Sequence, residues 1–442
     1  MCLCESTYWL SSPAQGNHDI LAGRLCLSRL WRTCGSLDGI SCMRRMSPAS
    51  WVWASDRRMT KYGDLIIRYW AQDGPACRRT MHSKSDIRCA MCSTAVRALV
   101  YDRYAEENDF ASILDIKDID EPEPGPREVC FRVRAAALNH DDIWGMRGKP
   151  IGVPMPHISG SDAAGDVTAV GSQVEGLKVG DRIVSHGNIS CRICRMCTSG
   201  REYDCKNRIV WGFQTGPLWG GFCEVSHLPE INAVPIPDGV SYEEAAASSM
   251  TMMTSWHMLV GRARIVPGQS VLIMGGGSGM GIFGIQIAKM FGCTVIATAG
   301  PGKLEQCIEL GADHAIDHRR DDWDSRVKEI AGSGLDVIFE HIGGEHWNRE
   351  LALLRRGGTV VTTGATTGYD VRTNLNRLTS EGLSILGSTQ GTRAELEQCL
   401  YWLSRGDIRA VIDSEYPLER AAEAHQRMLR GKGLFGKILL KP

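Results

Sequence analysis

The 442-residue sequence lacks the features that would assign it to a membrane or to nucleic acid. No apolar run in it approaches the roughly 20 residues that cross a bilayer. Its net charge is −1 at pH 7, so no excess of positive charge predicts a nucleic-acid partner. The first residues, MCLCESTYWL, lack the basic start and apolar stretch of a secretory signal. These absences favour a cytoplasmic protein with neither a membrane nor a nucleic acid as partner.

The first 94 residues also lack the periods of 2 and 3.6 that mark strands and amphipathic helices. They are rich in Cys, Trp, Arg and Met, as in SCMRRMSPASWVWASDRRMT. A transit peptide is an alternative that the acidic residues and the tryptophans weaken. We expect residues 1–94 to be an irregular, poorly ordered extension and regard Met91 as a candidate functional start.

From residue 95 the chain has two successive patterns. Short strands punctuated by glycine, such as EVCFRVRAAALN and SGSDAAGDVTAVGSQVEGLKVGDRIVS, predict a β-rich module over residues 95–240. From SVLIM onward, strands alternate with helices through residue 386. This alternation predicts an α/β domain with a doubly wound parallel sheet covered by helices on both faces.

Four thiols lie within the stretch CRICRMCTSGREYDC. The spacing C-x2-C-x2-C-x7-C indicates metal ligands in a reducing compartment. Zinc accepts four thiolates tetrahedrally, and such a closed shell leaves no position for substrate. The sequence therefore predicts one structural zinc ion per chain, with four unpaired surface cysteines as the alternative. The predicted ligands are Cys191, Cys194, Cys197 and Cys205.

The glycine run GGGSGMG stands between the strand SVLIM and the helix IFGIQIAKMFG, which predicts a dinucleotide-binding turn. Backbone N–H groups at a helix N-terminus bind pyrophosphate, and glycine lets the chain approach that ligand. The literal G-x-G-x-x-G begins at Gly279, one turn late, and Ser278 takes a glycine-like place. The residues expected to contact the cofactor are Gly276, Ser278, Gly279, Met280 and Gly281.

The stretch after the next strand favours NADPH over NADH. NAD-binding turns carry an acidic residue about 20 positions beyond the glycines, which binds the ribose 2′-hydroxyl. Here Thr298, Ala299 and Gly300 stand at that place, and Lys303 follows. No carboxylate repels a 2′-phosphate, and Lys303 attracts one. The alternative is that Lys303 is a solvated residue at the start of a helix.

Together these features resemble the medium-chain dehydrogenase/reductase superfamily from about residue 95 to the end. The matching stretches are AAALNHDDIWGMRG, GSDAAGDVTAVGSQVEGLKVGDRIV, the cysteine lobe, EEAAASSMTMMTSWHML and GKILLKP. The resemblance implies a GroES-like catalytic domain at 95–240, a Rossmann domain at 241–386 and a return of residues 387–442 to the catalytic domain. It places Thr254 near the nicotinamide, with helix packing as the alternative. We also expect a homo-oligomer, either a dimer or a tetramer.

Alcohol dehydrogenases of this superfamily bind a second, catalytic zinc through a cysteine, the histidine of a G-H-E motif and a third cysteine or acid. The matching positions here are Asn139, Ser161 and Met250. Neutral oxygens and a thioether are poor zinc ligands. A rearranged zinc site is the alternative, built from His140, Asp141, Asp142 and Asp162.

Without that zinc, nothing acidifies an alcohol for oxidation. Hydride from NADPH adds to a polarised C=C without a metal when hydrogen-bond donors stabilise the developing enolate. The resemblance thus implies a quinone oxidoreductase or acryloyl-CoA reductase-like enzyme acting on an enone, an enoyl thioester or a quinone. Asn139 is the candidate catalytic residue, orienting the substrate carbonyl. A zinc-dependent alcohol dehydrogenase and a non-catalytic nucleotide-binding redox sensor remain alternatives.

Overall fold

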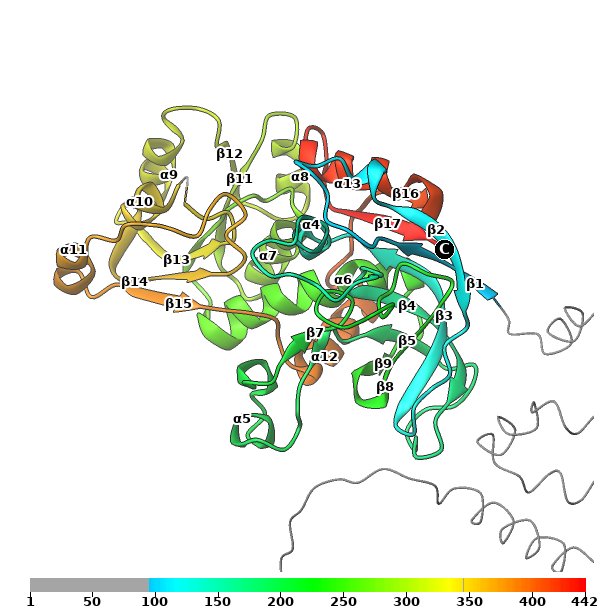
Figure 1. Cartoon of the computed structure of the whole chain (residues 1–442). Helices are drawn as coiled ribbons and strands as arrows, with labels where there is room; N and C mark the ends of the chain where they lie inside the picture. Colours follow the sequence, from blue (N-terminus) through cyan, green and yellow to red (C-terminus); the bar gives the residue numbers. More distant parts are fainter. Residues whose placement is uncertain (1–94, 345) are drawn as a thin grey trace, which may run out of the picture. The chain divides into compact units, whose positions relative to one another are not determined.

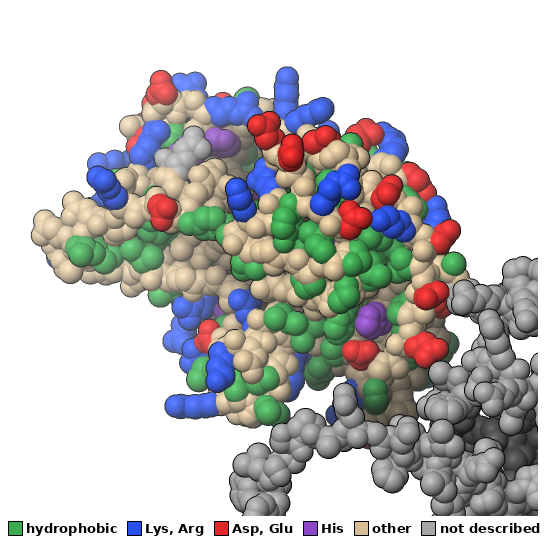
Figure 2. All heavy atoms as spheres, in the orientation of Figure 1, with side chains coloured by type: hydrophobic (Ala, Val, Ile, Leu, Met, Phe, Trp, Pro, Cys, Tyr) green, Lys and Arg blue, Asp and Glu red, His purple; other side chains and the backbone are tan. Residues whose placement is uncertain are grey.

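The computed structural model describes residues 95–344 and 346–442 (Figure 1). The expectations for residues 1–94, including the start at Met91, lie outside these residues. Within the described ranges, every helix is too short or too polar to span a bilayer. On the face drawn in Figure 2, basic and acidic side chains are interspersed along the edges, and apolar side chains lie across the middle.

A six-stranded parallel sheet forms the nucleotide-binding half. Its strands lie in the order β12-β11-β10-β13-β14-β15, and each neighbouring pair is parallel. Val271, Leu272 and Ile273 on the central strand are fully buried, as expected for a strand covered on both faces. This confirms the doubly wound α/β fold. The strands are β10 (Ser270–Ile273), β11 (Thr294–Ala299), β12 (His314–Asp317), β13 (Leu335–Glu340), β14 (Leu354–Thr362) and β15 (Ser384–Gly387).

Helices connect these strands and cover the sheet (Figure 1). The first of them, α7, follows the glycine turn and begins beside the end of β10. The helices of this half are α7 (Gly279–Met290), α8 (Leu304–Glu309), α9 (Trp323–Ala331), α10 (Trp347–Leu351) and α11 (Leu375–Ser380).

The other half is the β-rich, GroES-like module. Its seven-stranded sheet follows the path β16-β17-β3-β4-β5-β9, and β8 pairs with β3. The strands are β3 (Glu128–Ala137), β4 (Asp162–Val170), β5 (Arg182–Ser185), β8 (Val225–Pro229), β9 (Ala233–Pro235), β16 (Ile412–Pro417) and β17 (Lys437–Lys441). Smaller pairs are β1 (Ala95–Val100) with β2 (Asp115–Asp120) and β6 (Asn188–Ile189) with β7 (Ile209–Val210).

The C-terminal strand β17 joins this sheet next to β3, with Leu440 opposite Ala136. The pairing brings Lys437, at the start of β17, to the end of β3, where helix α4 (His140–Arg147) begins. Two further helices, α12 (Arg393–Ser404) and α13 (Ala421–Arg430), belong to the same C-terminal stretch. The pairing of β17 with β3 therefore gives the C-terminus a place beside the candidate site.

Helix α6 (Tyr242–Trp256) links the two sheets. Ser241 caps it by accepting a hydrogen bond from the Glu244 N–H, and the helix continues as the π-helix η7 (His257–Arg262). One apolar cluster contains residues of both sheets, for example Ala164 on β4 and Ile273 on β10. The two walls of the cleft between the sheets are therefore held by one shared core.

Candidate active site

A cleft of about 450 Å³ lies between the two halves. It opens near the ends of β10 and β13, where the strand order reverses. Ligands of doubly wound sheets bind at this switch point. Residues from both halves line it, among them Asn139, Asp141, Thr254, Gly279, Gln390 and Lys437.

The glycine turn provides a close-fitting cradle at one end of the cleft. Ser278 caps α7, its Oγ accepting from the Gly281 N–H at 2.9 Å. A Cβ on Gly281 would meet the Gly275 carbonyl oxygen at 2.2 Å, so only glycine fits. A Cβ on Gly276 would lie 3.0 Å from the Cys307 sulfur. Met280 also lines the cleft, so the predicted cofactor-binding residues of the turn lie together at a helix N-terminus.

Two buried polar atoms in the cleft have no protein partner. The Thr254 hydroxyl and the Gln390 Oε1 are buried and make no hydrogen bond to any described residue. Buried polar groups are nearly always paired, so these atoms fit contacts to a bound ligand. Thr254 lines the cleft, and its place near the nicotinamide stays a prediction. Gln390 was missed, because its surroundings, STQGT, carry no motif.

Thr298 and Lys303, which were predicted to lie near the ribose, make different contacts. Thr298 is fully buried and contacts the glycine turn, its Oγ1 accepting from the Gly275 N–H at 3.2 Å. Lys303 directs its ammonium to the Gly431 carbonyl at 2.8 Å. The cation beside position 300 is Arg319, because a Cβ on Gly300 would lie 2.9 Å from its Nη2. Sequence reasoning missed Arg319, which follows the next strand in the stretch HRRDD.

A second cavity of about 480 Å³ contains this arginine, with Thr298, Arg320 and Arg349 also in its wall. Arg320 pairs with Asp322 and Arg349 with Asp324. The Arg319 guanidinium has no such partner in the part of the chain that the structure describes. Arg319 therefore remains available to an anion in this cavity.

A buried lysine lies between the glycine turn and the candidate catalytic residue Asn139. The Lys437 ammonium donates to the Leu138 carbonyl at 2.8 Å and to the Asn139 Oδ1 at 2.5 Å. It also lies 3.5 Å from an Asp162 oxygen. Asn139 in turn donates from Nδ2 to Asp162 at 2.8 Å. The Asn139 amide is thus held on both sides, and its position on the cleft wall is fixed by these contacts.

Two further carboxyl groups lie at the start of α4. Asp142 accepts from the Asn139 and Gly160 N–H groups at 2.7 and 3.1 Å. Asp141 accepts from the Ser161 hydroxyl at 2.7 Å. Burial raises the pKa of Asp141 to about 6 and that of Asp142 well above its ordinary value. The cluster therefore keeps a proton at pH values where an exposed carboxyl group has lost its own.

These contacts leave no metal site at the positions where the superfamily's alcohol dehydrogenases hold zinc. Asn139 binds an ammonium, Ser161 binds Asp141, and the Met250 N–H donates to Asp162 at 2.9 Å. Among residues 95–344 and 346–442, the one group of His, Cys, Asp or Glu side chains close enough to hold a metal ion is the four-cysteine lobe. The alternative of a rearranged site around His140 is therefore not supported.

The four cysteines converge on one point. Sulfur atoms of Cys191 and Cys205, and of Cys194 and Cys197, lie 3.5 Å apart, and those of Cys191 and Cys197 lie 3.9 Å apart. A tetrahedron of thiolates around zinc, with Zn–S bonds of about 2.3 Å, has sulfur separations of about 3.8 Å. The donor set and its spacing fit a structural zinc ion.

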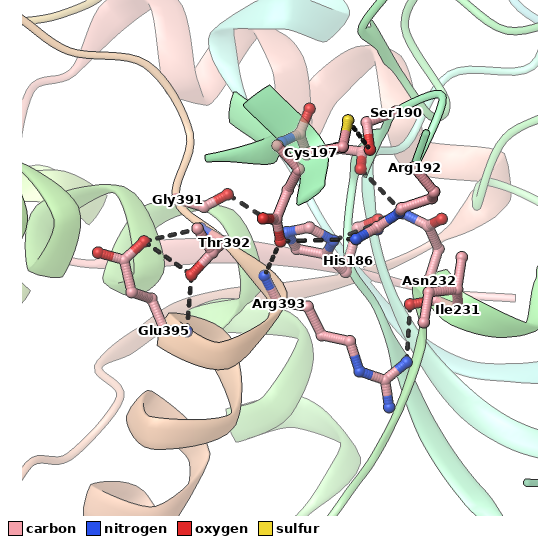
Figure 3. Close-up of polar contacts among 12 residues, drawn as sticks. His186, Ser190, Arg192, Cys197, Ile231, Asn232, Gly391, Thr392, Arg393 and Glu395 are labelled. Atoms are coloured by element: carbon pink, nitrogen blue, oxygen red, sulfur yellow. Dashed lines mark hydrogen bonds and ion pairs between the residues drawn. The ribbon is translucent and has the colours of Figure 1, made fainter. Parts of the chain in front are cut away.

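The cysteine lobe is tied to the segment that precedes α12 (Figure 3). Glu202, within the lobe, accepts from the Arg393 N–H at 2.9 Å. His186 contacts the Gly391 carbonyl at 3.4 Å, and the Arg393 guanidinium donates to the Ile231 carbonyl at 2.7 Å. Gln390, one residue earlier, lines the cleft. The lobe therefore helps to position one wall of the candidate active site.

Two family models match these halves. The alcohol dehydrogenase GroES-like domain matches residues 125–238, and the zinc-binding dehydrogenase model matches residues 279–405. An alcohol dehydrogenase of Geobacillus stearothermophilus is 30% identical over 336 residues, which cover 75% of this chain and 97% of that protein. The chain belongs to the medium-chain dehydrogenase/reductase superfamily. Its class is therefore that of the oxidoreductases, as the sequence predicted.

Similar members of the superfamily differ in their activities. A quinone oxidoreductase of Pongo abelii is 28% identical over 73% of this chain and 92% of its own length. The crystal structure of an NAD-dependent alcohol dehydrogenase has a TM-score of 0.74 and 37% identity, covering 78% of this chain and 99% of that one. The 2-octenoyl-CoA carboxylase reductase CinF, in complex with NADP and 2-octenoyl-CoA, has a TM-score of 0.72 and 26% identity, covering 81% and 90%. The two solved structures share the fold of this chain, one being named for NAD and the other holding NADP, and the names of the three proteins differ in substrate.

Proposed function

We propose that this protein is an NADPH-dependent reductase of activated C=C bonds, acting on an enone, an enoyl thioester or a quinone without a catalytic metal. The observation that carries the proposal is the set of groups at the catalytic-zinc positions. The Asn139 amide oxygen accepts from Lys437, the Ser161 hydroxyl donates to Asp141, and Met250 offers only a thioether. These groups are poor zinc ligands, which disfavours Lewis-acid activation of an alcohol and favours reduction of a polarised C=C bond, which needs no metal.

The nucleotide proposal rests on Arg319. A 2′-phosphate beside Gly300 would meet a guanidinium that has no ion pair among residues 95–344 and 346–442, and no carboxylate directly follows β11 to repel it. The glycine turn would hold the pyrophosphate, and the unpaired Thr254 and Gln390 atoms would contact the nicotinamide end. We assign one zinc ion to the four-cysteine lobe, where a closed thiolate shell stabilises the fold.

The reaction balances as follows. Bound NADPH supplies a hydride. The β-carbon of the substrate receives it, and the π electrons of the C=C bond move onto the carbonyl oxygen to give an enolate. A proton from water adds to the α-carbon and restores the carbonyl. Trp144, Phe213 and Met250 give the cleft an apolar wall for the substrate body.

Alcohol oxidation is the second candidate, because an NAD-dependent alcohol dehydrogenase shares 37% identity with this chain. The two candidates separate in one assay. NADPH absorbance is followed with cyclohexenone, benzoquinone and acryloyl-CoA, and the reverse direction is followed with primary and secondary alcohols and either oxidised nucleotide. We expect reduction of at least one activated C=C substrate and no alcohol oxidation. Alcohol oxidation that a fast chelator abolishes while the fold stays intact would support the second candidate instead.

A further inference from the structure

Lys437 is a buried cation placed at the cofactor turn. Its side chain is 3% exposed, and its stem lies where a Cβ on Gly279 would come within 2.7 Å of Cδ. Two of its three N–H groups donate to Leu138 and Asn139. The third has only the 3.5 Å ion pair with Asp162. One donor of a buried ammonium is thus left without a short hydrogen bond on the wall of the cleft.

Burying an ammonium costs free energy because the charge loses its hydration, and a methionine would fill the same space without that cost. A role for the charge would explain why a lysine is kept here. Pairing with Asp162 is one reason, but Asp162 already accepts hydrogen bonds from the Asn139 amide and the Met250 N–H. Both groups adjoin the positions where related dehydrogenases hold a metal ion. Burial lowers the pKa of Lys437 more than the three neighbouring carboxyl groups raise it. Its Nζ donates to Leu138 and Asn139 beside the positions where the superfamily's alcohol dehydrogenases keep a metal cation.

We infer that the Lys437 ammonium stabilises the developing enolate, its third N–H donating to the carbonyl oxygen of the bound substrate. The inference rests on the proposed function. As the hydride forms the new C–H bond at the β-carbon, the electron pair that reaches oxygen meets this N–H. The ammonium keeps its proton, and the α-carbon takes one from water. Lys437 is then a catalytic residue, and Asn139 is a positioning residue that holds Nζ through Oδ1.

The test separates a catalytic lysine from a mere partner of Asp162. Lys437→Met alone leaves Asp162 buried without a cation and is expected to destabilise the fold. The informative variant is therefore the double one, Lys437→Met with Asp162→Asn, which removes both charges. The matched control is Lys441→Met with Glu243→Gln. It removes a part-exposed ion pair between β17, the strand that carries Lys437, and helix α6, outside the cleft.

Three quantities are measured on each variant: the midpoint of thermal unfolding, the NADPH dissociation constant by fluorescence, and kcat for the best substrate. A fourth readout needs no turnover. In the complex with NADP+, the absorbance of bound 4-nitrophenol shows what fraction of the ligand is the nitrophenolate anion rather than the neutral phenol.

For the double variant we expect near-normal unfolding and NADPH binding, with kcat lowered about 100-fold. The preference for nitrophenolate should be lost, while the control pair keeps every value. A double variant that keeps the kcat and the nitrophenolate binding of the unmodified protein would overturn the inference. So would a rise in the NADPH dissociation constant that accounts for the whole loss of activity. If the unmodified protein reduces no activated C=C bond yet favours nitrophenolate through Lys437, Lys437 is an oxyanion contact, and the enolate role fails together with the proposed function.

Discussion

The chemistry of this cleft depends on single residues and on the charged side chains that they contact. Asn139 stands where a related dehydrogenase has a metal-binding cysteine, and an amide oxygen at that point attracts an ammonium. Gly300 stands where NAD-binding proteins carry a carboxylate, and its missing side chain leaves room for Arg319. In both places, the small or neutral residue matters because of the cation beside it.

The nucleotide preference is testable at this scale. Gly300 is not held at positive φ, and the atom that a Cβ would meet is the flexible end of Arg319. Gly300→Asp therefore needs only a shift of that side chain and would place a carboxylate against the guanidinium. We expect the NADPH-over-NADH preference to fall at least tenfold, about 1.4 kcal/mol. Arg319→Ala should weaken NADPH binding and leave NADH binding unchanged, as measured by titration of each nucleotide.

The matched control for Arg319 is Arg320→Ala, because Arg320 already pairs with Asp322. Equal effects of the two alanine substitutions would refute the assignment of Arg319. An unmodified protein that prefers NADH tenfold would refute the choice of NADPH.

Among the elements, the cysteine lobe and α12 form a coupled pair. The lobe has no core of its own, because none of the residues of its short helix α5 (Arg195–Thr198) is buried. Its shape depends on the four thiolates and on bonds such as that from the Arg393 N–H to Glu202. Loss of the metal ion should therefore reach the cleft through the segment that carries Gln390.

Cys194→Ser tests this coupling. We expect the zinc content to fall from one ion per chain and the midpoint of thermal unfolding to fall by about 5 °C or more. NADPH binding should weaken only in part, since the lobe supports Gln390, at the nicotinamide end, and not the glycine turn that holds the pyrophosphate. Arg195→Ala, an exposed change in the same helix, is the control. Two zinc ions per unmodified chain, by elemental analysis, would contradict a structural-only metal.

At the scale of the whole molecule, the described residues form their own cores. The buried apolar residues begin at Val96 on β1, and the largest cluster spans both sheets. β1 itself is held by β2 and by the bridge from Ala98 to Cys223. We therefore expect folding of this part to depend on β1.

A chain that starts at Met91 should unfold within about 2 °C of the full chain and bind NADPH equally. A chain that starts at residue 117 is the control, because it loses β1, on which Val96, Ala98 and Leu99 are buried. It should be insoluble or unfolded. Loss of soluble protein on removing residues 1–90 alone would show that the extension is needed for folding.

The sequence by itself determined the features that depend on neighbours along the chain. The spacing from Cys191 to Cys205, the glycine turn before α7 and the alternation of strands with helices follow from local geometry. Each could therefore be predicted before any tertiary contact was known. The loss of the metal ligands at Asn139 and Ser161 was also visible, through the resemblance to the superfamily.

Only the tertiary structure decided which side chains meet in the cleft. Lys437 reaches Asn139 across 298 positions of sequence because β17 pairs with β3. Arg319 reaches Gly300 because β12 lies beside β11. Gln390 reaches the cleft because His186 contacts the Gly391 carbonyl and Glu202 of the cysteine lobe accepts from the Arg393 N–H. The physical reason is the same in each case. The periodicity of the sequence around a charged or polar side chain does not identify its long-range partner. The role of that side chain therefore depends on which strands the fold places side by side.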